Sequence, residues 1–291
     1  MDVHELQAFV AVTEYGSFSI AAENLFLTQP AVSKRVSTLE MGLGVALFDR
    51  IGRRIRLTGA GKTLLPRAKQ ILLDIEDATR SLSNLSEEVS GTLTVGTSHH
   101  IGLHRLPPVL RQFSERFPAV QLDMKFIDSE EAYEGVLHGS LELGIVTLPP
   151  EPQRSVETEK IWHDPLCFVI SPEHALANNT TVAALELAQH TAILPSFQTF
   201  TRRIVEEKFR EQKLVIDVAM STNYLETIHM MVSIGLGWSV LPESLLNEQV
   251  LKLNVEDMSF ARSLGVVYHS NRTLSNAAKR MLELLRENGE G

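Results

Sequence analysis

The spacing of apolar residues changes about a third of the way along this 291-residue chain. Up to about residue 89 the apolar residues recur mainly at helical spacing, whereas beyond residue 90 short apolar runs typical of strands alternate with helical segments. Helical regions and strand–helix alternation build different layer architectures. The sequence therefore predicts an α + α/β chain with three regions, at 1–58, 59–89 and 90–291.

Residues 1–58 are expected to contain three helices. The first covers about residues 3–15, and a short second helix begins near Ser19. The third begins after Thr28, a residue type suited to capping a helix N-terminus. Residues 49–58 then predict two short strands joined by a turn. Three helices followed by such a hairpin form a winged helix-turn-helix.

The third helix has an apolar side and a polar side. Val32, Val36 and Leu39 define the stripe that we expect to be buried. The opposite side has no acidic residue before Glu40, so it can approach phosphates without repulsion. From the helix N-terminus, the amide of Gln29 can reach the edge of an adenine. The other residues on this outer face are Pro30, Ser33, Lys34 and Ser37.

Cationic residues are concentrated near this helix, although the whole chain has a net charge of −9. Residues 28–69 contain nine lysines and arginines and only two acids, which gives this segment a net charge of +7. A basic segment in an acidic chain is typical of nucleic-acid binding. The alternatives are an ordinary solvated face or a three-helix module that binds proteins.

The first 65 residues resemble the DNA-binding domain of the LysR-type transcriptional regulators. The matching segments are AAENL at 21–25, TQPAVSK at 28–34, LE at 39–40, LFDR at 47–50 and LTGAG at 57–61. The resemblance implies that the outer face of the third helix contacts DNA and that Arg53 and Arg54 serve the wing. Lys34 stands where the family commonly has arginine, so it can pair with a phosphate but lacks the bidentate fork. The predicted DNA-binding residues are Thr28, Gln29, Pro30, Ser33, Lys34, Ser37, Arg50, Arg53 and Arg54.

A single long helix is expected over residues 59–89, with Pro66 as its one strong breaker. Leu64, Ala68, Ile71, Ile75, Ala78, Leu82, Leu85 and Val89 recur at alternating spacings of four and three, which is a heptad seam. So narrow a seam on a helix of roughly 46 Å needs a partner helix. The sequence predicts a homodimer; the alternative is packing against the chain's own domain. The predicted dimer contacts are Leu64, Ala68, Ile71, Ile75 and Leu82.

Dimerisation would relate two recognition helices by a two-fold axis, so the DNA site is expected to be an inverted repeat. The LysR-type resemblance further implies a homotetramer built as a dimer of dimers.

Residues 90–291 are expected to form two α/β lobes, each an open, mostly parallel sheet with helices on both faces. The chain crosses between them near 162 and 265, so lobe I comprises 90–161 and 267–291, and lobe II comprises 162–266. This arrangement resembles that of the periplasmic binding proteins, which the LysR-type effector domain shares. Strands are expected at 92–96, 120–126, 143–146, 166–170, 192–194, 215–220, 238–240 and 265–268, and helices at 102–117, 130–138, 182–189, 200–212, 224–234 and from 275.

Open α/β sheets bind ligands beyond the carboxyl ends of their strands. Four strand-to-helix junctions there, at 97–100, 128–129, 196–199 and 221–223, are rich in hydroxyl and small polar groups. Free N–H groups at helix starts bind anions, so a small, polar, anionic metabolite is expected between the lobes. At each junction the alternative is a side chain that only caps its own helix. The predicted effector-binding residues are Thr97, Ser98, His99, His100, Ser129, Thr147, Ser196, Phe197, Gln198, Thr199 and Thr222.

His99, His100 and His104 invite comparison with a metal site. No carboxylate or cysteine lies near them in the sequence, so we expect hydrogen bonding to a ligand or structural roles, with no metal and no cofactor. Cys167 is the only cysteine, which excludes an intrachain disulfide. Within its apolar run it is expected to be a small buried core residue.

Motifs of several other protein classes are missing from the sequence. G-x-S-x-G, H-E-x-x-H, P-loop and G-x-G-x-x-G patterns are absent, so no enzyme is expected. No run of about 18 apolar residues predicts a membrane span, and no secretory signal is recognisable, so a cytoplasmic location is expected. The expected function is DNA-binding transcriptional regulation controlled by a small effector, with RNA polymerase as a candidate partner. The alternatives are a ligand-independent regulator and a solute-binding protein.

Overall fold

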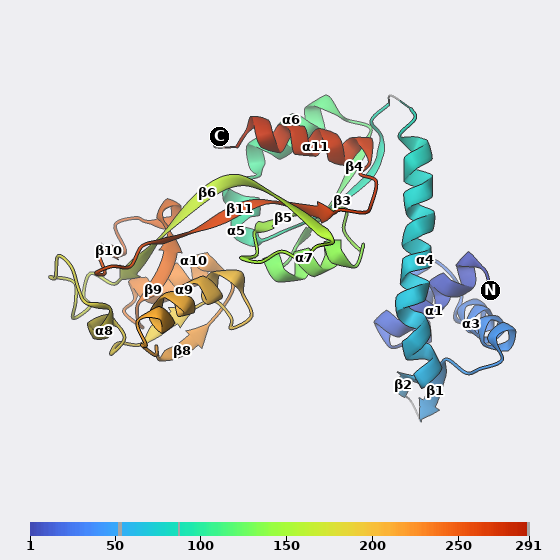
Figure 1. Ribbon diagram of the computed structural model, residues 1–291, viewed down its shortest axis with the longest axis horizontal. Helices are drawn as coiled ribbons and strands as arrows, with labels where there is room; N and C mark the ends of the chain where they lie inside the picture. Colours follow the sequence, from blue (N-terminus) through green and yellow to red (C-terminus); the bar gives the residue numbers. More distant parts are fainter. Residues whose placement is uncertain (52–53, 87, 290–291) are drawn as a thin grey trace. The chain divides into compact units, whose positions relative to one another are not determined.

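The computed structural model describes residues 1–51, 54–86 and 88–289 (Figure 1). The chain divides into two compact units, Met1–Leu85 and Ser86–Gly291. Each unit has its own hydrophobic core, so each is described by itself.

The first unit is a winged helix-turn-helix followed by a long helix. A capping box between Asp2 and Glu5 starts α1, and the hydroxyl of Thr28 accepts a hydrogen bond from the N–H of Ala31 at the start of α3. The predicted stripe of α3 is buried against α1 and α2, and the predicted hairpin forms. The elements are α1 (Val3–Tyr15), α2 (Phe18–Asn24), α3 (Gln29–Leu43), β1 (Phe48–Ile51), β2 (Arg54–Leu57) and α4 (Gly59–Ser83).

The long helix α4 is shorter than the sequence predicted. It continues through Pro66 but ends at Ser83 instead of near residue 89. Val89 packs against the core of the second unit, so the chain must leave the helix before it. The last two positions of the predicted seam, Leu85 and Val89, therefore lie outside the helix.

The second unit has the two lobes that the sequence predicted. Its strands are β3 (Gly91–Thr97), β4 (Val120–Phe126), β5 (Leu143–Thr147), β6 (Val156–Ile170), β7 (Ala192–Leu194), β8 (Val218–Ser221), β9 (Ser239–Pro242), β10 (Leu251–Leu253) and β11 (Phe260–His269). Its helices are α5 (His99–His104), α6 (Pro107–Arg116), α7 (Ser129–Leu137), α8 (Ala184–Leu187), α9 (Phe200–Glu211), α10 (Leu225–Ser233) and α11 (Asn276–Glu287), with a 3₁₀ turn, η1 (Glu243–Leu245). Within lobe I, α6 and α11 cover one face of the sheet and α7 covers the other (Figure 1).

The sheet arrangement differs from the predicted one. Two long antiparallel strands, β6 and β11, run through both lobes and join them into one mixed sheet of seven strands, β9 included. The parallel pairings in that sheet are β3 with β4 and β3 with β5, and β7 with β8 forms a separate parallel pair. The register shift between Leu264 and Gly265 lies where the sequence placed the second crossing. The lobes are thus joined by a continuous two-stranded hinge.

Three smaller differences concern the bounds and the number of elements. The predicted helix at 102–117 is divided into α5 and α6, because Pro107 begins a new helix at its first position. The crossing strand β6 begins at Val156 instead of 166, and the short strand β10 was not predicted.

Cys167 is buried as expected, and burial raises the pKa of its thiol to about 11.

Among the described residues, no helix is both long enough and apolar enough to cross a membrane.

Candidate functional site

The outer face of α3 is open to solvent. Val32, Val36 and Leu39 are at most 1% exposed, and helical periodicity turns the opposite side chains outward. Gln29, the first residue of the helix, is exposed at its N-terminal end. The residues that line this outer face are Gln29, Pro30, Ser33, Lys34, Ser37, Thr38 and Met41.

Two residues beside the outer face have structural roles. The hydroxyl of Thr28 accepts the N-cap hydrogen bond, although its own proton remains available to a phosphate. Glu40 Oε1 accepts hydrogen bonds from the N–H groups of Leu47 (2.7 Å) and Phe48 (3.2 Å). The carboxylate therefore joins α3 to the first strand of the wing. The sequence alone showed Glu40 only as the first acid of the helix.

The wing is an antiparallel hairpin in which Asp49 lies opposite Arg56. Arg53 lies outside the described residues, and nothing is described of the side chains of Arg50 and Arg54, so their DNA contacts stay predictions.

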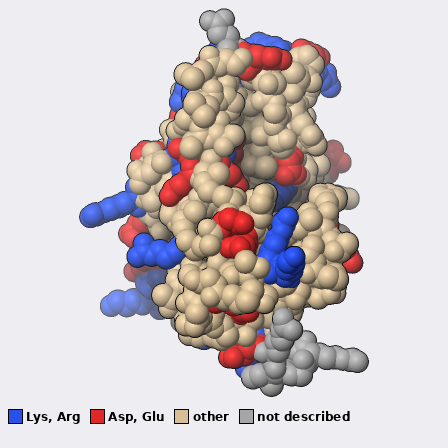
Figure 2. All heavy atoms as spheres, turned by 90° about the vertical axis from the view of Figure 1, so that its right-hand side faces the viewer, with Lys and Arg blue, Asp and Glu red and all other residues tan. Residues whose placement is uncertain are grey.

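On the face drawn in Figure 2, lysine and arginine side chains form separate clusters between acidic ones.

The predicted dimer seam on α4 consists of two different surfaces. Ala68 is fully buried in the core of the first unit, and Leu64 and Ile71 pack against the same core. All three make intrachain contacts, because this half of α4 packs on α1. Ala68 has no exposed surface left for a partner, whereas Leu64 and Ile71 are only partly buried, so their dimer contacts stay predictions. Ile75 and Leu82 are 39% and 70% exposed, and neither belongs to the packed core of the first unit.

A small cleft separates the two lobes beside the hinge strands. It encloses about 50 Å³, which is space for one or two water molecules. Five predicted effector residues, Ser98, His100, Ser129, Thr147 and Thr199, line it. The other lining residues are Asp128, Glu130, Pro195, Thr201, Asn223, Leu225 and Arg262.

The remaining predicted effector residues lie elsewhere. Thr97 is fully buried and its hydroxyl donates to the carbonyl of Ile145 (2.8 Å), so its role is structural. The His99 ring packs against Tyr224, with ring centroids 4.8 Å apart. Phe197 and Gln198 line a wider groove of about 1080 Å³ beside α7 and α9. Ser196 and Thr222 do not line the cleft; they make hydrogen bonds within lobe II.

The helix-cap alternative holds for one junction and not for another. Thr199 accepts a cap hydrogen bond from the N–H of Arg202, as a purely structural residue would. Ser98 occupies the N-cap position of α5 but makes no side-chain cap hydrogen bond. The same is true of Asp128 at α7. The side chains of Ser98 and Asp128 thus face the cleft without serving their helices.

Two carboxylates of lobe I accept hydrogen bonds from donors of lobe II. Glu130 Oε1 accepts from the N–H of Phe200 (2.5 Å) in the first turn of α9, and Asp128 Oδ2 accepts from the amide of Asn223 (2.6 Å). Burial raises the pKa of Glu130. One helix-start N–H at which we expected an external anion, that of Phe200, is therefore filled by the chain's own Glu130.

Arg262 lies at the base of the cleft and was not among the predicted residues. Its guanidinium is buried, and its Nε is 2.6 Å from Asp164 Oδ2. Its Nη1 donates to Thr201 Oγ1 (3.1 Å), whereas its Nη2 has no hydrogen-bond partner among the described residues. Arg105 Nη2 is 3.6 Å from Asp164 Oδ1. A charged residue inside the mostly apolar strand β11 was the sequence signal that could have identified Arg262.

His100 is 4% exposed, and burial, together with the nearby charge of Arg262, lowers its pKa to about 3. The imidazole is therefore neutral at physiological pH. Neither of its ring nitrogens has a partner among the described residues. His104 Nε2 is 3.1 Å from Glu226 Oε1 across the lobes.

The structure therefore defines a class of protein. Its members have a winged helix-turn-helix unit and a two-lobed unit with an interlobe cleft. A family model described as the LysR substrate binding domain matches residues 86–290. A second model, for bacterial regulatory helix-turn-helix proteins of the lysR family, matches residues 3–62. The chain belongs to the LysR family of transcriptional regulators, with an effector-binding domain.

Two relatives illustrate the sequence similarity. The HTH-type transcriptional activator CmpR of Synechocystis sp. is 28% identical over 288 residues, which cover 97% of this chain and 94% of CmpR. An uncharacterized HTH-type transcriptional regulator of Azotobacter vinelandii is 64% identical over 108 residues, which cover 37% of this chain and 75% of that protein.

Solved structures share the fold. A full-length OxyR variant from Pseudomonas aeruginosa has a TM-score of 0.73 at 23% identity and covers 98% of both chains. Full-length CbnR, solved with its target DNA, has a TM-score of 0.65 at 20% identity, with 99% of this chain and all of CbnR covered. The effector-binding domain of QuiR with shikimate has a TM-score of 0.63 at 18% identity and covers 69% of this chain and 98% of that domain.

Proposed function

We propose that this regulator binds an inverted-repeat DNA site as a dimer, with the outer face of α3 in the major groove. The observation that carries the proposal is that this face is exposed and free of acids, while the carboxylate of the adjacent Glu40 is engaged by two backbone N–H groups. The DNA complex of CbnR, a structural neighbour, gives the proposal additional support. Contact with RNA polymerase stays a prediction.

Two substitutions on α3 should have different effects on DNA binding. Gln29→Ala should reduce discrimination between the operator and a mismatched site by roughly 1–3 kcal/mol, because a base contact is lost. Lys34→Ala should weaken binding to all sequences and lower the slope of log affinity against log salt by about one, because one phosphate contact is lost. Fluorescence anisotropy with both DNAs at several salt concentrations measures both effects.

Lys279→Ala is the matched control, since it removes one exposed positive charge from α11 in the other unit. It should leave both the discrimination and the salt slope unchanged. Wild-type discrimination in Gln29→Ala would contradict the assignment of α3 as the reading helix.

We propose that the dimer forms through the C-terminal half of α4, where Ile75 and Leu82 are exposed at the predicted seam positions. A dimer of dimers is the assembly implied by the family, and light scattering at increasing concentration would detect it.

We propose further that the effector is a small anionic metabolite bound between Ser98, Ser129 and Arg262. Two features support a carboxylate ligand: the free Nη2 of buried Arg262, and the lobe II donors that now hold Glu130 and Asp128. QuiR, whose effector domain shares this fold, was solved with shikimate, a carboxylate. Since about 50 Å³ is too small for such a molecule, the lobes must separate about the β6–β11 hinge to admit it.

Ser98→Ala should weaken binding of the effector by about 10- to 100-fold, because a hydrogen bond to a charged ligand is worth about 1.5–3 kcal/mol. Candidate carboxylates are titrated calorimetrically into the full-length protein to find the effector. Ser140→Ala is the control, since the exposed Ser140 hydroxyl donates to the carbonyl of Gly135 outside the cleft. If a carboxylate binds Ser98→Ala as tightly as wild type, the proposed cleft site is wrong; if none binds, the ligand-independent alternative is favoured.

A further inference from the structure

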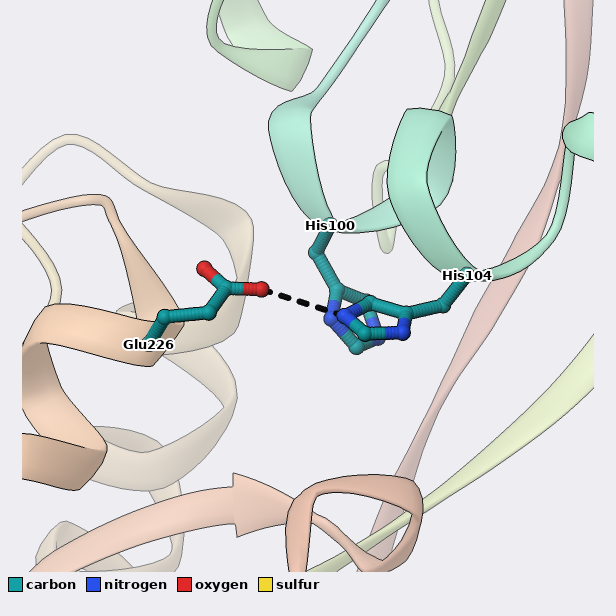
Figure 3. Close-up of side chains that lie close together, drawn as sticks. All are labelled: His100, His104 and Glu226. Atoms are coloured by element: carbon teal, nitrogen blue, oxygen red, sulfur yellow. Dashed lines mark hydrogen bonds and ion pairs between the residues drawn. The ribbon is translucent and has the colours of Figure 1, made fainter.

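Three side chains with metal-binding donors meet across the lobes beside the effector cleft. His100 and His104 lie one helical turn apart on α5 of lobe I, and Glu226 extends toward them from α10 of lobe II (Figure 3). One donor atom of each residue lies within 4.8 Å of the others. The sequence argued against a metal because it showed no carboxylate nearby, and Glu226 is 122 positions from His104.

The cluster contains a buried histidine whose nitrogens have no other partner. His100 is 4% exposed, yet neither Nδ1 nor Nε2 makes a hydrogen bond to any described residue. Buried polar atoms in folded proteins nearly always have a partner, and each exception calls for an explanation such as an ion.

We propose that His100, His104 and Glu226 coordinate a divalent transition-metal ion, with zinc as the type ion, which links α5 to α10 across the two lobes. Two imidazole nitrogens and one carboxylate oxygen are a donor set of three-ligand zinc sites, in which water or another ligand completes a tetrahedron. Imidazole suits zinc, copper and nickel better than magnesium or calcium, so the hard cations should not compete.

The charges around the cluster predict its affinity relative to other zinc sites. Arg262 and Arg105 both act on His100, and the single carboxylate of Asp164 pairs with both of them. The positive charges of Arg262 and Arg105 oppose the ion, and only three protein ligands hold it. Binding should be weaker than at closed four-ligand structural sites, and therefore reversible.

The location predicts a consequence for the lobes. Because the ligands come from both lobes, the ion binds the arrangement in which α5 and α10 are close and favours it by its differential affinity. His100 also lines the effector cleft, so zinc and effector are expected to influence each other's binding reciprocally. Zinc binding itself does not depend on the identity or the existence of the effector.

The test uses the full-length protein, without a histidine tag, after removal of metals. Zinc chloride is titrated calorimetrically in a non-chelating buffer, and one ion per chain is expected. His104→Ala and Glu226→Gln should each weaken binding at least about tenfold, since even outer-shell substitutions cost 10- to 100-fold. Both side chains are more than a third exposed, so the variants should fold. Zinc should also raise the urea midpoint of unfolding in wild type and not in either variant.

The control is a histidine–carboxylate pair that lacks the buried third ligand. On α7, His138 Nε2 lies 3.2 Å from Glu134 Oε2 with both side chains exposed. His138→Ala should bind zinc as wild type does. The proposal is overturned if wild type binds no zinc, or if His104→Ala and Glu226→Gln retain wild-type affinity.

Discussion

Replacing Leu82 with glutamate should convert the regulator into a monomer and reduce its affinity for an inverted-repeat site by about 10²- to 10⁴-fold. The magnitude is that of the avidity lost when two linked binding modules are separated. Leu82 is 70% exposed near the C-terminal end of α4, so a charge there should not disturb the fold of the protomer. Light scattering measures the oligomeric state, and anisotropy measures the affinity for the inverted repeat and for its half-site.

Arg80→Glu is the matched control, because it places the same side chain on the opposite side of the same turn of α4. It should remain dimeric and bind the inverted repeat nearly as wild type does, despite a larger change in charge. The affinity of Leu82→Glu for an isolated half-site should also equal that of a wild-type subunit. A dimeric Leu82→Glu protein would refute the assignment of this surface.

Asp164→Ala should destabilise the effector-binding domain by about 3–5 kcal/mol, because it leaves a buried charge uncompensated. Asp164 is 1% exposed and holds Arg262 at 2.6 Å, and the only other described partner of Arg262 is the hydroxyl of Thr201. Such a loss is a large fraction of the total stability of a typical domain. Urea unfolding followed by tryptophan fluorescence reports on this unit alone, since both tryptophans, Trp162 and Trp238, lie in it.

Two further variants isolate the effect of burial. Arg286→Ala breaks an ion pair with Glu159 whose atoms are similarly close but whose arginine is half exposed, and it should cost less than about 1 kcal/mol. Replacing both members of the buried pair, by Asp164→Leu with Arg262→Met, should recover most of the stability lost in Asp164→Ala. Equal losses in Asp164→Ala and Arg286→Ala would contradict the claim that burial makes the Asp164–Arg262 pair costly to break.

Much of the DNA-binding unit was predictable because its signals are local. The buried stripe of α3 and its exposed outer face follow from a 3.6-residue period within one segment, and the wing follows from two short strands around a turn. In the second unit, the order of strands and helices located both lobes and several residues of the cleft, because ligand positions in open α/β sheets follow from where strands end.

The surfaces of α4 show a limit of local pattern. Ala68 and Leu82 occupy equivalent positions of one heptad seam, yet the first is fully buried and the second is 70% exposed. The spacing of apolar residues predicts which side chains of α4 share a face. It does not predict how much of that face is covered, because this depends on the length of α1, against which α4 packs.

Sequence period and residue type alone therefore indicated a helical region followed by an α/β region, the polarity of α3 and the strand ends that border the cleft. Only the tertiary structure brought Arg262 to Asp164, 98 positions apart, and Glu226 to His104, 122 positions apart. The physical reason is that a charge or a metal ligand acts over a few ångströms, and those distances arise only when the two hinge strands pair and the lobes face each other.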